Sequence, residues 1–123
     1  MNIRFSTLLL SLLFLANVSA QELLVDNFTE QVSDLSARTE KRNDINDTPC
    51  ALVKIELPLQ GVQFDQRSQV IGNVEYKVNT YWAYLPAGSK HLTLSHPQFH
   101  TLDVYFGDYG ISSLQSLTTY VLK

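Results

Sequence analysis

The sequence predicts an all-β fold and, within that class, a small β-sandwich. From Ala51 onward, apolar side chains recur at every second position, which is the period of strands that bury one face. Turn signals separate these runs at intervals of about 8–12 residues, as they do in sandwiches and barrels. The five glycines and four prolines lie in or beside these strands and turns, so none of them interrupts a helical pattern.

The first 20 residues have the pattern of a cleavable secretory signal. Arg4 supplies the positive start, Leu8–Leu15 form a short apolar run, and Val18–Ala20 offer small residues before the cut. The apolar run is too short for a membrane anchor, which needs about 20 residues. We expect residues 1–20 to be removed, no membrane insertion afterwards, and a periplasmic or extracellular protein.

Residues 21–49 predict a mostly irregular N-terminal arm. The arm is rich in Asp, Asn, Glu, Ser and Thr, and its apolar residues show no sustained alternation. Phe28, Val32 and Leu35 fit the spacing of one short helix, while segment 33–38 fits an extended chain along a sheet equally well. We expect the arm to end at Pro49 and the sandwich domain to occupy residues 50–123.

The first predicted strand of that domain is Ala51–Leu57, and Pro58 ends it because proline cannot donate to a sheet ladder. Further runs predict strands at Val62–Phe64, Val70–Val78, Tyr81–Leu85, Thr101–Phe106 and Thr118–Leu122. Gly72 indicates a bulge or a close backbone approach within the predicted strand Val70–Val78. Asn79 and Thr80 form the predicted connection into the next one.

Residues 85–99 combine a turn, an alternating strand and a second turn. Pro86 and Gly88 supply the fixed and the permissive backbone angles of a tight reversal. Leu92 and Leu94 then share one face of a strand, while the alternate polar residues share the other. His96 and Pro97 end the strand.

As written, Pro86–Phe99 resembles the PEGA motif, a proline-x-glycine turn followed by a Leu- or Val-rich strand that ends in His-Pro-Gly-Tyr. Ala87 stands where the motif has its name-giving Glu, and Gln98-Phe99 replace Gly-Tyr. The likeness extends more loosely over Val53–Val121, and segments 34–38 and 44–54 are similar to the N-terminal part of exported PEGA-like proteins of the Bacteroides group. The resemblance implies a small β-sandwich-like module near the bacterial surface.

The charge and the cysteine content of the chain narrow the range of possible functions. The chain carries 9 Lys and Arg against 12 Asp and Glu, and loss of the signal removes one of the basic residues, Arg4. An acidic domain without basic clusters is not expected to bind nucleic acid or an anionic membrane. Cys50 is the only cysteine, so no intramolecular disulfide forms, and its apolar neighbours favour a small buried side chain over a nucleophile.

No pattern of catalytic residues emerges. His91, His96 and His100 invite comparison with a zinc site, but strand alternation places His91 on a polar face, and the other two flank the turn at Pro97. The chain has no nucleophile elbow and no phosphate-binding loop between a strand and a helix. The sequence therefore predicts no enzyme, no metal site and no cofactor.

Aromatic residues are the remaining candidates for ligand binding, namely Trp82, Tyr84 and Tyr105. Tyrosine and tryptophan serve both sugar-binding faces and protein interfaces. Trp82 and Tyr84 share one face of their strand and Tyr81 has the other, so one of these sets must lie in the core. For a domain this small, core packing is favoured over a recognition surface.

We therefore expect an exported, non-catalytic module that binds or scaffolds at the bacterial cell envelope, with an envelope protein or a glycan as its partner. One alternative is a glycan-binding module that uses Trp82, Tyr84 and Tyr105 as stacking platforms. Another is a small metal-binding exported protein built on the three histidines. A further possibility is strand-mediated self-association through the arm, with the sandwich folding without it.

Overall fold

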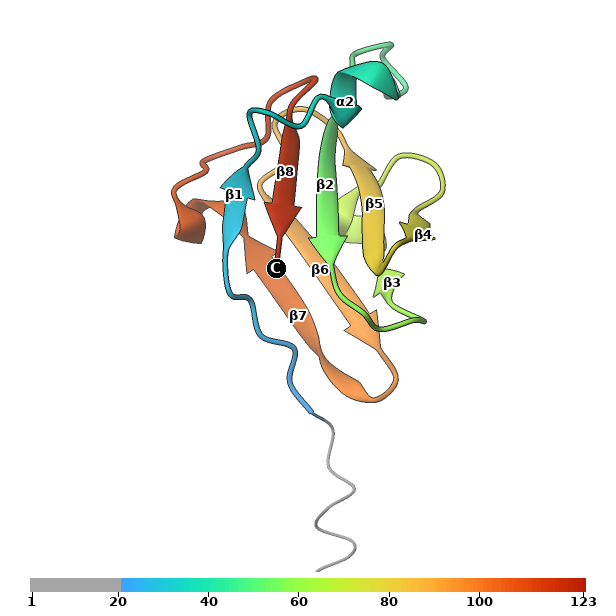
Figure 1. Cartoon of the computed structure of the whole chain (residues 1–123), viewed down its shortest axis with the longest axis vertical. Helices are drawn as coiled ribbons and strands as arrows, with labels where there is room; N and C mark the ends of the chain where they lie inside the picture. The colour runs from blue at the N-terminus through green and yellow to red at the C-terminus, as the bar shows by residue number, and fades with distance from the viewer. Residues whose placement is uncertain (1–20) are drawn as a thin grey trace, which may run out of the picture.

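The computed structural model describes residues 21–123, whose regular structure is mainly eight strands in two sheets (Figure 1). The all-β prediction is confirmed, and the two sheets fit the predicted β-sandwich. The predicted signal peptide, residues 1–20, lies outside the described residues. Within residues 21–123, no helix is long and apolar enough to cross a membrane.

The elements have the following bounds. The strands are β1 (Phe28–Glu30), β2 (Ala51–Glu56), β3 (Gln63–Phe64), β4 (Glu75–Lys77), β5 (Thr80–Leu85), β6 (His91–His96), β7 (Phe99–Tyr105) and β8 (Thr119–Leu122). A short helix, α2 (Ser36–Thr39), follows β1, and the 3₁₀ turns η1 (Gln66–Ser68) and η2 (Phe106–Tyr109) follow β3 and β7. Most strands thus lie close to the predicted runs.

The larger sheet has the strand order β1-β8-β2-β5-β4, and the smaller has the order β3-β6-β7. All neighbouring strands are antiparallel except β2 and β8, which run parallel. Figure 1 shows the smaller sheet behind the larger one, with β1 and β7 on one side and β3 and β4 on the other.

The core lies between the sheets and is built by the period-two alternation. Val53 and Ile55 of β2, Ala83 of β5, and Leu92 and Leu94 of β6 are at most 3% exposed and belong to one cluster. Because each of these side chains comes from every second strand position, the intervening residues lie on the outer faces. Burial of these branched side chains is the main stabilising contribution to the fold.

The arm is mostly irregular, as expected, but it also contributes to the core, which corrects the expectation of a leader separate from the sandwich. Its β1 pairs with β8, and Phe28 is only 2% exposed between Phe106 and Tyr120, with ring centroids 4.6 and 5.6 Å away. Of the two alternatives left open for Phe28, Val32 and Leu35, the helix at their spacing is absent, and a short helix lies at residues 36–39 instead. Removal of the arm would uncover the Phe106 and Tyr120 rings, so we do not expect the sandwich to fold unchanged without it.

The predicted strand Val70–Val78 is mostly wrong, because only Glu75–Lys77 pair with β5. Residues 70–74 form a loop instead. The Arg42 side chain lies against this loop and donates to the Ile71 and Asn73 carbonyl oxygens at 2.7 and 3.0 Å. These bonds cross Gly72, where an added Cβ would come within 3.0 Å of the guanidinium. The close approach expected at Gly72 is thus present, although the strand around it is not.

The segment that resembles the PEGA motif adopts the local structure expected for it. In the turn after β5, the Ser89 amide donates to the Pro86 carbonyl at 3.2 Å, and Gly88 has a φ of 91° with open space around it. Glycine is thus needed for its backbone angle and not for lack of room. Leu92 and Leu94 face the core as predicted, which identifies a turn and a strand but not a family.

Candidate binding surfaces

The structure divides the three candidate aromatics between two surfaces. Trp82 and Tyr84 lie on the outer face of the five-stranded sheet, where they belong to a small cluster with Cys50 and Leu52. Tyr105 lies on β7, in the other sheet. One ligand-binding site made of all three rings is therefore not present.

Tyr84 is covered by the protein itself and does not offer a stacking platform. The ring is 5% exposed, its hydroxyl donates to the Glu40 carbonyl oxygen at 2.6 Å, and the Arg42 guanidinium lies 4.3 Å from the ring centroid. Burial, followed by the charge of Glu40, raises the pKa of the Tyr84 hydroxyl. Tyr84 thus fastens the segment after α2 to the sheet.

Trp82 is half-buried, and two ammonium groups contact its ring. Lys54 Nζ lies 4.2 Å and Lys77 Nζ 3.8 Å from the ring centroid. These lysines come from β2 and β4, the strands on either side of β5. A cation at this distance is attracted by the ring quadrupole. A ligand that stacked on Trp82 would therefore have to displace one of the protein's own ammonium groups.

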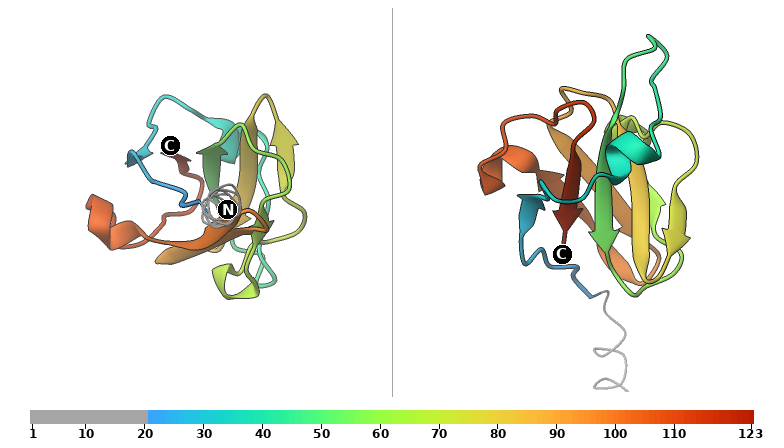
Figure 2. Two further views of the ribbon diagram at one scale, coloured as in Figure 1. Left: turned by 90° about the horizontal axis from the view of Figure 1, so that it is seen from below. Right: turned by 45° about the horizontal axis from the view of Figure 1, so that its top comes forward.

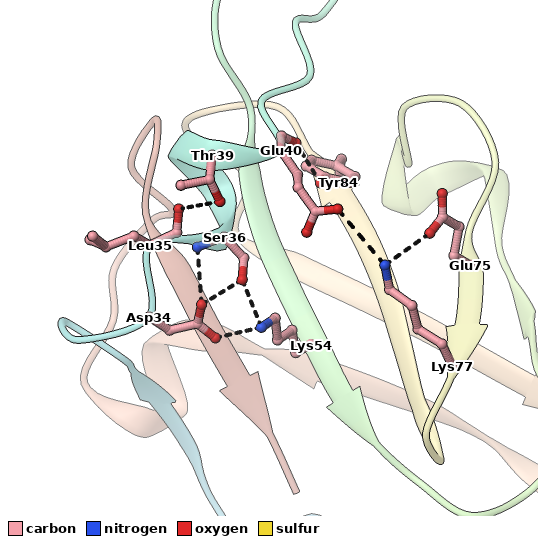
Figure 3. A network of polar contacts seen from close by, with 9 residues as sticks. All are labelled: Asp34, Leu35, Ser36, Thr39, Glu40, Lys54, Glu75, Lys77 and Tyr84. Carbon is pink, nitrogen blue, oxygen red and sulfur yellow. Dashed lines mark hydrogen bonds and ion pairs between the residues drawn. The ribbon is translucent and has the colours of Figure 1, made fainter.

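The Lys54 ammonium also joins the arm to the sheet (Figure 3). It donates to Asp34 Oδ2 at 2.5 Å and to Ser36 Oγ at 2.9 Å, while Ser36 donates from its hydroxyl and its backbone to Asp34 Oδ1. Burial alone would raise the pKa of Asp34, but the hydrogen bonds from Lys54 and Ser36 outweigh it and hold the pKa below 3.8. The carboxylate is therefore ionised and fully engaged.

The contact between Ser36 and Lys54 has the composition of a nucleophile–base pair but not its protonation pattern. A lysine that activates a serine must accept the hydroxyl proton. Here Lys54 donates to both Ser36 and the Asp34 carboxylate, and the Ser36 hydroxyl donates to Asp34. This arrangement makes the cluster a link between α2 and β2.

Lys77 completes the charged surface around Trp82. Its ammonium lies 3.3 Å from Glu75 Oε2 and 4.0 Å from Glu40 Oε1, as Figure 3 shows. A hollow of about 550 Å³ lies beside these groups and is lined by Asp34, Lys54, Lys77 and Trp82, among others. Because the chain's own carboxylates pair these lysines, the hollow offers little uncompensated charge.

Tyr105 is the one of the three aromatics that is open to solvent, with 54% of its surface exposed. The His91 ring stacks against it with a centroid distance of 5.8 Å. On the same face Thr93 donates from its hydroxyl to Asp103 at 2.7 Å, and Arg67 pairs with Asp65 at 2.9 Å. The surface therefore combines an exposed ring with hydrogen-bonding groups of both charges.

The three histidines are not brought together. His91 and His96 occupy opposite ends of β6, about 16 Å apart at about 3.3 Å per residue. The Gln98 amide donates to His96 Nδ1 at 3.1 Å, which leaves Nε2 as the donor to the Gln60 carbonyl at 3.0 Å. Among residues 21–123, no group of three or more His, Cys, Asp or Glu side chains is arranged to hold a metal ion.

Cys50 is buried and 1% exposed, as its apolar neighbours predicted. Burial, followed by the charge of Asp44, raises the pKa of the Cys50 thiol, although Arg42 opposes the shift. A buried thiol with a raised pKa is a poor nucleophile.

A second hollow, of about 610 Å³, lies between β3 and the loop that precedes β4. Its lining comes from segments 62–66, 69–70 and 72–74, including the amide side chains of Gln63, Gln66, Gln69 and Asn73. Sequence reasoning missed these residues, because isolated amides in strands and turns match no binding motif. The only signal in the sequence is that three of them, all glutamines, are three residues apart. This spacing becomes informative only once the turn at η1 is known to bring them to one hollow.

Comparison of this chain with family models, with curated proteins and with solved structures finds no match. The resemblance to the PEGA motif thus stays a prediction carried by Pro86–Phe99.

Proposed function

We propose that this chain is an exported, non-catalytic binding module of the bacterial cell envelope, which recognises an envelope protein or glycan through the outer face of its three-stranded sheet. The observation that carries the proposal is the exposure of Tyr105, 54% against 5% for Tyr84. An exposed tyrosine offers a large apolar area together with a hydroxyl, a combination that recognition surfaces use.

The surroundings of Tyr105 support recognition of a polar partner. His91 holds one side of the ring, and the nearby charges of Asp65, Arg67 and Asp103 include both signs. A mixed surface of this kind suits hydrogen bonding to a protein or glycan, whereas a nucleic acid requires clustered positive charge.

The non-catalytic part of the proposal is supported by the state of the reactive groups. The Lys54 ammonium is held by a carboxylate, His96 is bonded through both ring nitrogens to backbone groups, and Cys50 is buried. The envelope location is supported by the signal-like pattern of residues 1–20 and by the resemblance of Pro86–Phe99 to the PEGA motif.

Export is tested by fractionating cells that produce the chain and determining its N-terminus by mass spectrometry. The proposal expects a protein outside the cytoplasm that begins at Gln21. A cytoplasmic protein that keeps Met1 would contradict it.

Recognition is tested by immobilising the wild-type protein, Tyr105→Ala and Ile45→Ala, and passing solubilised envelope protein and glycan over each. Ile45 is a matched exposed apolar control, since it is 97% exposed in a distant loop. We expect the same component to be retained by the wild type and by Ile45→Ala, and to be lost with Tyr105→Ala. Equal retention by all three proteins would refute a role for the Tyr105 face.

A further inference from the structure

We infer that the hollow between β3 and the loop that leads into β4 is a binding site for a short neutral oligosaccharide. Both strands are the outermost strands of their sheets and lie on the same side of the sandwich, opposite β1 (Figure 1). The hollow of about 610 Å³ falls within the range of about 300–1,000 Å³ for small-molecule sites. The hollow borders the Tyr105 surface at Asp65, but its other lining residues are different, and the inference does not depend on the function proposed for Tyr105.

The chemistry of the walls selects an uncharged, hydroxyl-rich ligand. The polar lining residues are Gln63, Asp65, Gln66, Gln69 and Asn73, and the hollow is lined by no lysine, arginine or histidine. Four amides and one carboxylate give an anion no cationic partner, and the carboxylate repels it, so phosphate, sulfate and acidic sugars are disfavoured. Each amide carries two donors beside one acceptor, a pattern that matches adjacent sugar hydroxyls.

The amides and the carboxylate keep hydrogen-bonding capacity for a ligand. Within residues 21–123, no intramolecular hydrogen bond uses the side-chain amides of Gln63, Gln66, Gln69 or Asn73. Asp65 accepts from the Arg67 amide and from Arg67 Nε through Oδ1 alone, which leaves Oδ2 for a sugar hydroxyl. Apolar surface comes from Val62, Phe64, Val70 and Val74, against which the C–H face of a sugar ring can pack.

The backbone that carries these groups is fixed on both sides of the hollow. On the β3 side, the Asp65 amide donates to the Thr93 carbonyl at 3.1 Å and the Ser68 hydroxyl accepts from the Thr93 amide at 2.8 Å. On the β4 side, the Ile71 amide donates to the Tyr84 carbonyl at 2.8 Å, and Arg42 holds the Ile71 and Asn73 carbonyls. A frame held in this way lowers the entropy cost of ordering a ligand.

Gln69 offers a substitution that separates binding from folding. Its φ is 59°, in the left-handed region, where glycine is unstrained and asparagine is well tolerated. Gln69→Gly therefore removes an amide from the hollow without weakening the backbone there, while Gln69→Asn keeps an amide. Gln98→Ala is the matched control, because Gln98 is an exposed glutamine in the turn between β6 and β7.

The purified protein is first screened on an array of neutral glycans. It is then titrated with cellobiose, maltose, N,N′-diacetylchitobiose and any further glycan from the array, and binding is followed by ¹⁵N–¹H NMR and calorimetry. We expect at least one to bind with shift changes centred on residues 62–74. Loss of one hydrogen-bonding amide in Gln69→Gly should weaken binding by about tenfold. Gln69→Asn should recover most of that loss, and Gln98→Ala should bind as the wild type does.

Several results would overturn the inference. One is the absence of binding by every neutral glycan on the array. Another is binding that Gln69→Gly and Asn73→Ala leave unchanged. A third is a stronger response to an extended peptide or an acidic disaccharide than to any neutral sugar. Shift changes centred on Tyr105 and His91 would also refute this site, while supporting the separate proposal for the other face.

Discussion

The outer faces of the two sheets carry aromatic residues in opposite states. On the five-stranded sheet, Arg42, Lys54 and Lys77 lie against the rings of Tyr84 and Trp82. On the three-stranded sheet, Tyr105 is 54% exposed and contacts a neighbouring imidazole. An outward-facing aromatic is thus available to a partner only where the chain's own cations and covering segments leave its ring free.

The arm accounts for part of this difference, since it covers Tyr84. After β1, the chain passes through α2 and the following segment along the five-stranded sheet (Figure 2). Ala37 of α2 and Tyr84 of β5 are both buried in this contact. The Ala37 amide donates to the Thr119 hydroxyl at 3.1 Å, and Lys54 joins Asp34 and Ser36. The arm therefore makes the five-stranded face part of the folded structure, and substitutions there should affect stability.

The largest effect is expected for Phe28→Ala, which removes the arm's contribution to the core. The side chain is 2% exposed and stacks on two other rings, so its loss should lower the free energy of unfolding by about 3–5 kcal/mol. Urea denaturation measures the change, and Phe28→Leu, which keeps most of the apolar contact, should cost clearly less. Val32→Ala, at a position 79% exposed in the arm, is the control. A loss below about 1 kcal/mol for Phe28→Ala would mean that the arm is not part of the core.

The second effect concerns the link between the arm and the five-stranded sheet. Lys54→Met keeps the length of the side chain but leaves the Asp34 carboxylate without its cation. Because the two side chains are 16% and 27% exposed, the cost at pH 7 should lie between those of surface and buried pairs, at about 1–2 kcal/mol. Lys123→Met, which breaks an exposed pair with Glu56, should cost less than about 0.5 kcal/mol.

The pH dependence gives this second prediction a distinct signature. The folded-state pKa of Asp34 is below 3.8, so its contribution to stability is present above pH 3.8 and is lost as the pH falls through the folded-state pKa. The difference in stability between the wild type and Lys54→Met should therefore shrink below pH 3.8. A difference that stays constant down to pH 2 would show that Asp34 does not depend on Lys54.

The third effect is a gain in stability at the turn that closes β4 and β5. Val78 and Asn79 have φ values of 53° and 56°, and Val78 is 93% exposed. A β-branched residue in the left-handed region is strained, whereas asparagine is tolerated there. Val78→Asn should raise the free energy of unfolding by about 1 kcal/mol, observed as a higher midpoint in thermal unfolding. Val32→Asn is the control without a positive φ, and an equal gain there would contradict this explanation.

The strands with sustained alternation were predictable from sequence. In β2, Val53 and Ile55 alternate with Lys54 up to Pro58, so period and terminator agree. In contrast, β1 has three residues of which only Phe28 is buried, too few to show a period. Its strand conformation comes from pairing with β8 at the far end of the chain, which is a tertiary effect. The predicted strand over Val70–Val78 failed for a related reason, since Arg42 fixes a loop there that local alternation does not reveal.

The candidate surfaces were predictable only in part. Parity placed Trp82 and Tyr84 on one face, which is correct. Sequence gave no means of seeing that Arg42, Lys54 and Lys77 would cover these rings, because Lys54 and Lys77 occupy strand positions typical of solvent-facing residues. The same limit applies to the amide-lined hollow, whose walls come from separate turns that only the paired sheets bring together.

The smallest effect on stability is expected for Tyr105→Ala, and this makes it the sharpest test of the contrast between the faces. The side chain is 54% exposed and has no hydrogen bond to the rest of residues 21–123. Its removal should therefore change the free energy of unfolding, measured by thermal unfolding, by less than about 0.5 kcal/mol. Trp82→Ala, on the covered face, should cost more, because it also removes the contacts with the Lys54 and Lys77 ammonium groups. If Tyr105→Ala proved the more destabilising of the two, the outer face of the three-stranded sheet would be a structural surface like that of the five-stranded sheet. The proposal that this face binds a partner would then have to be abandoned.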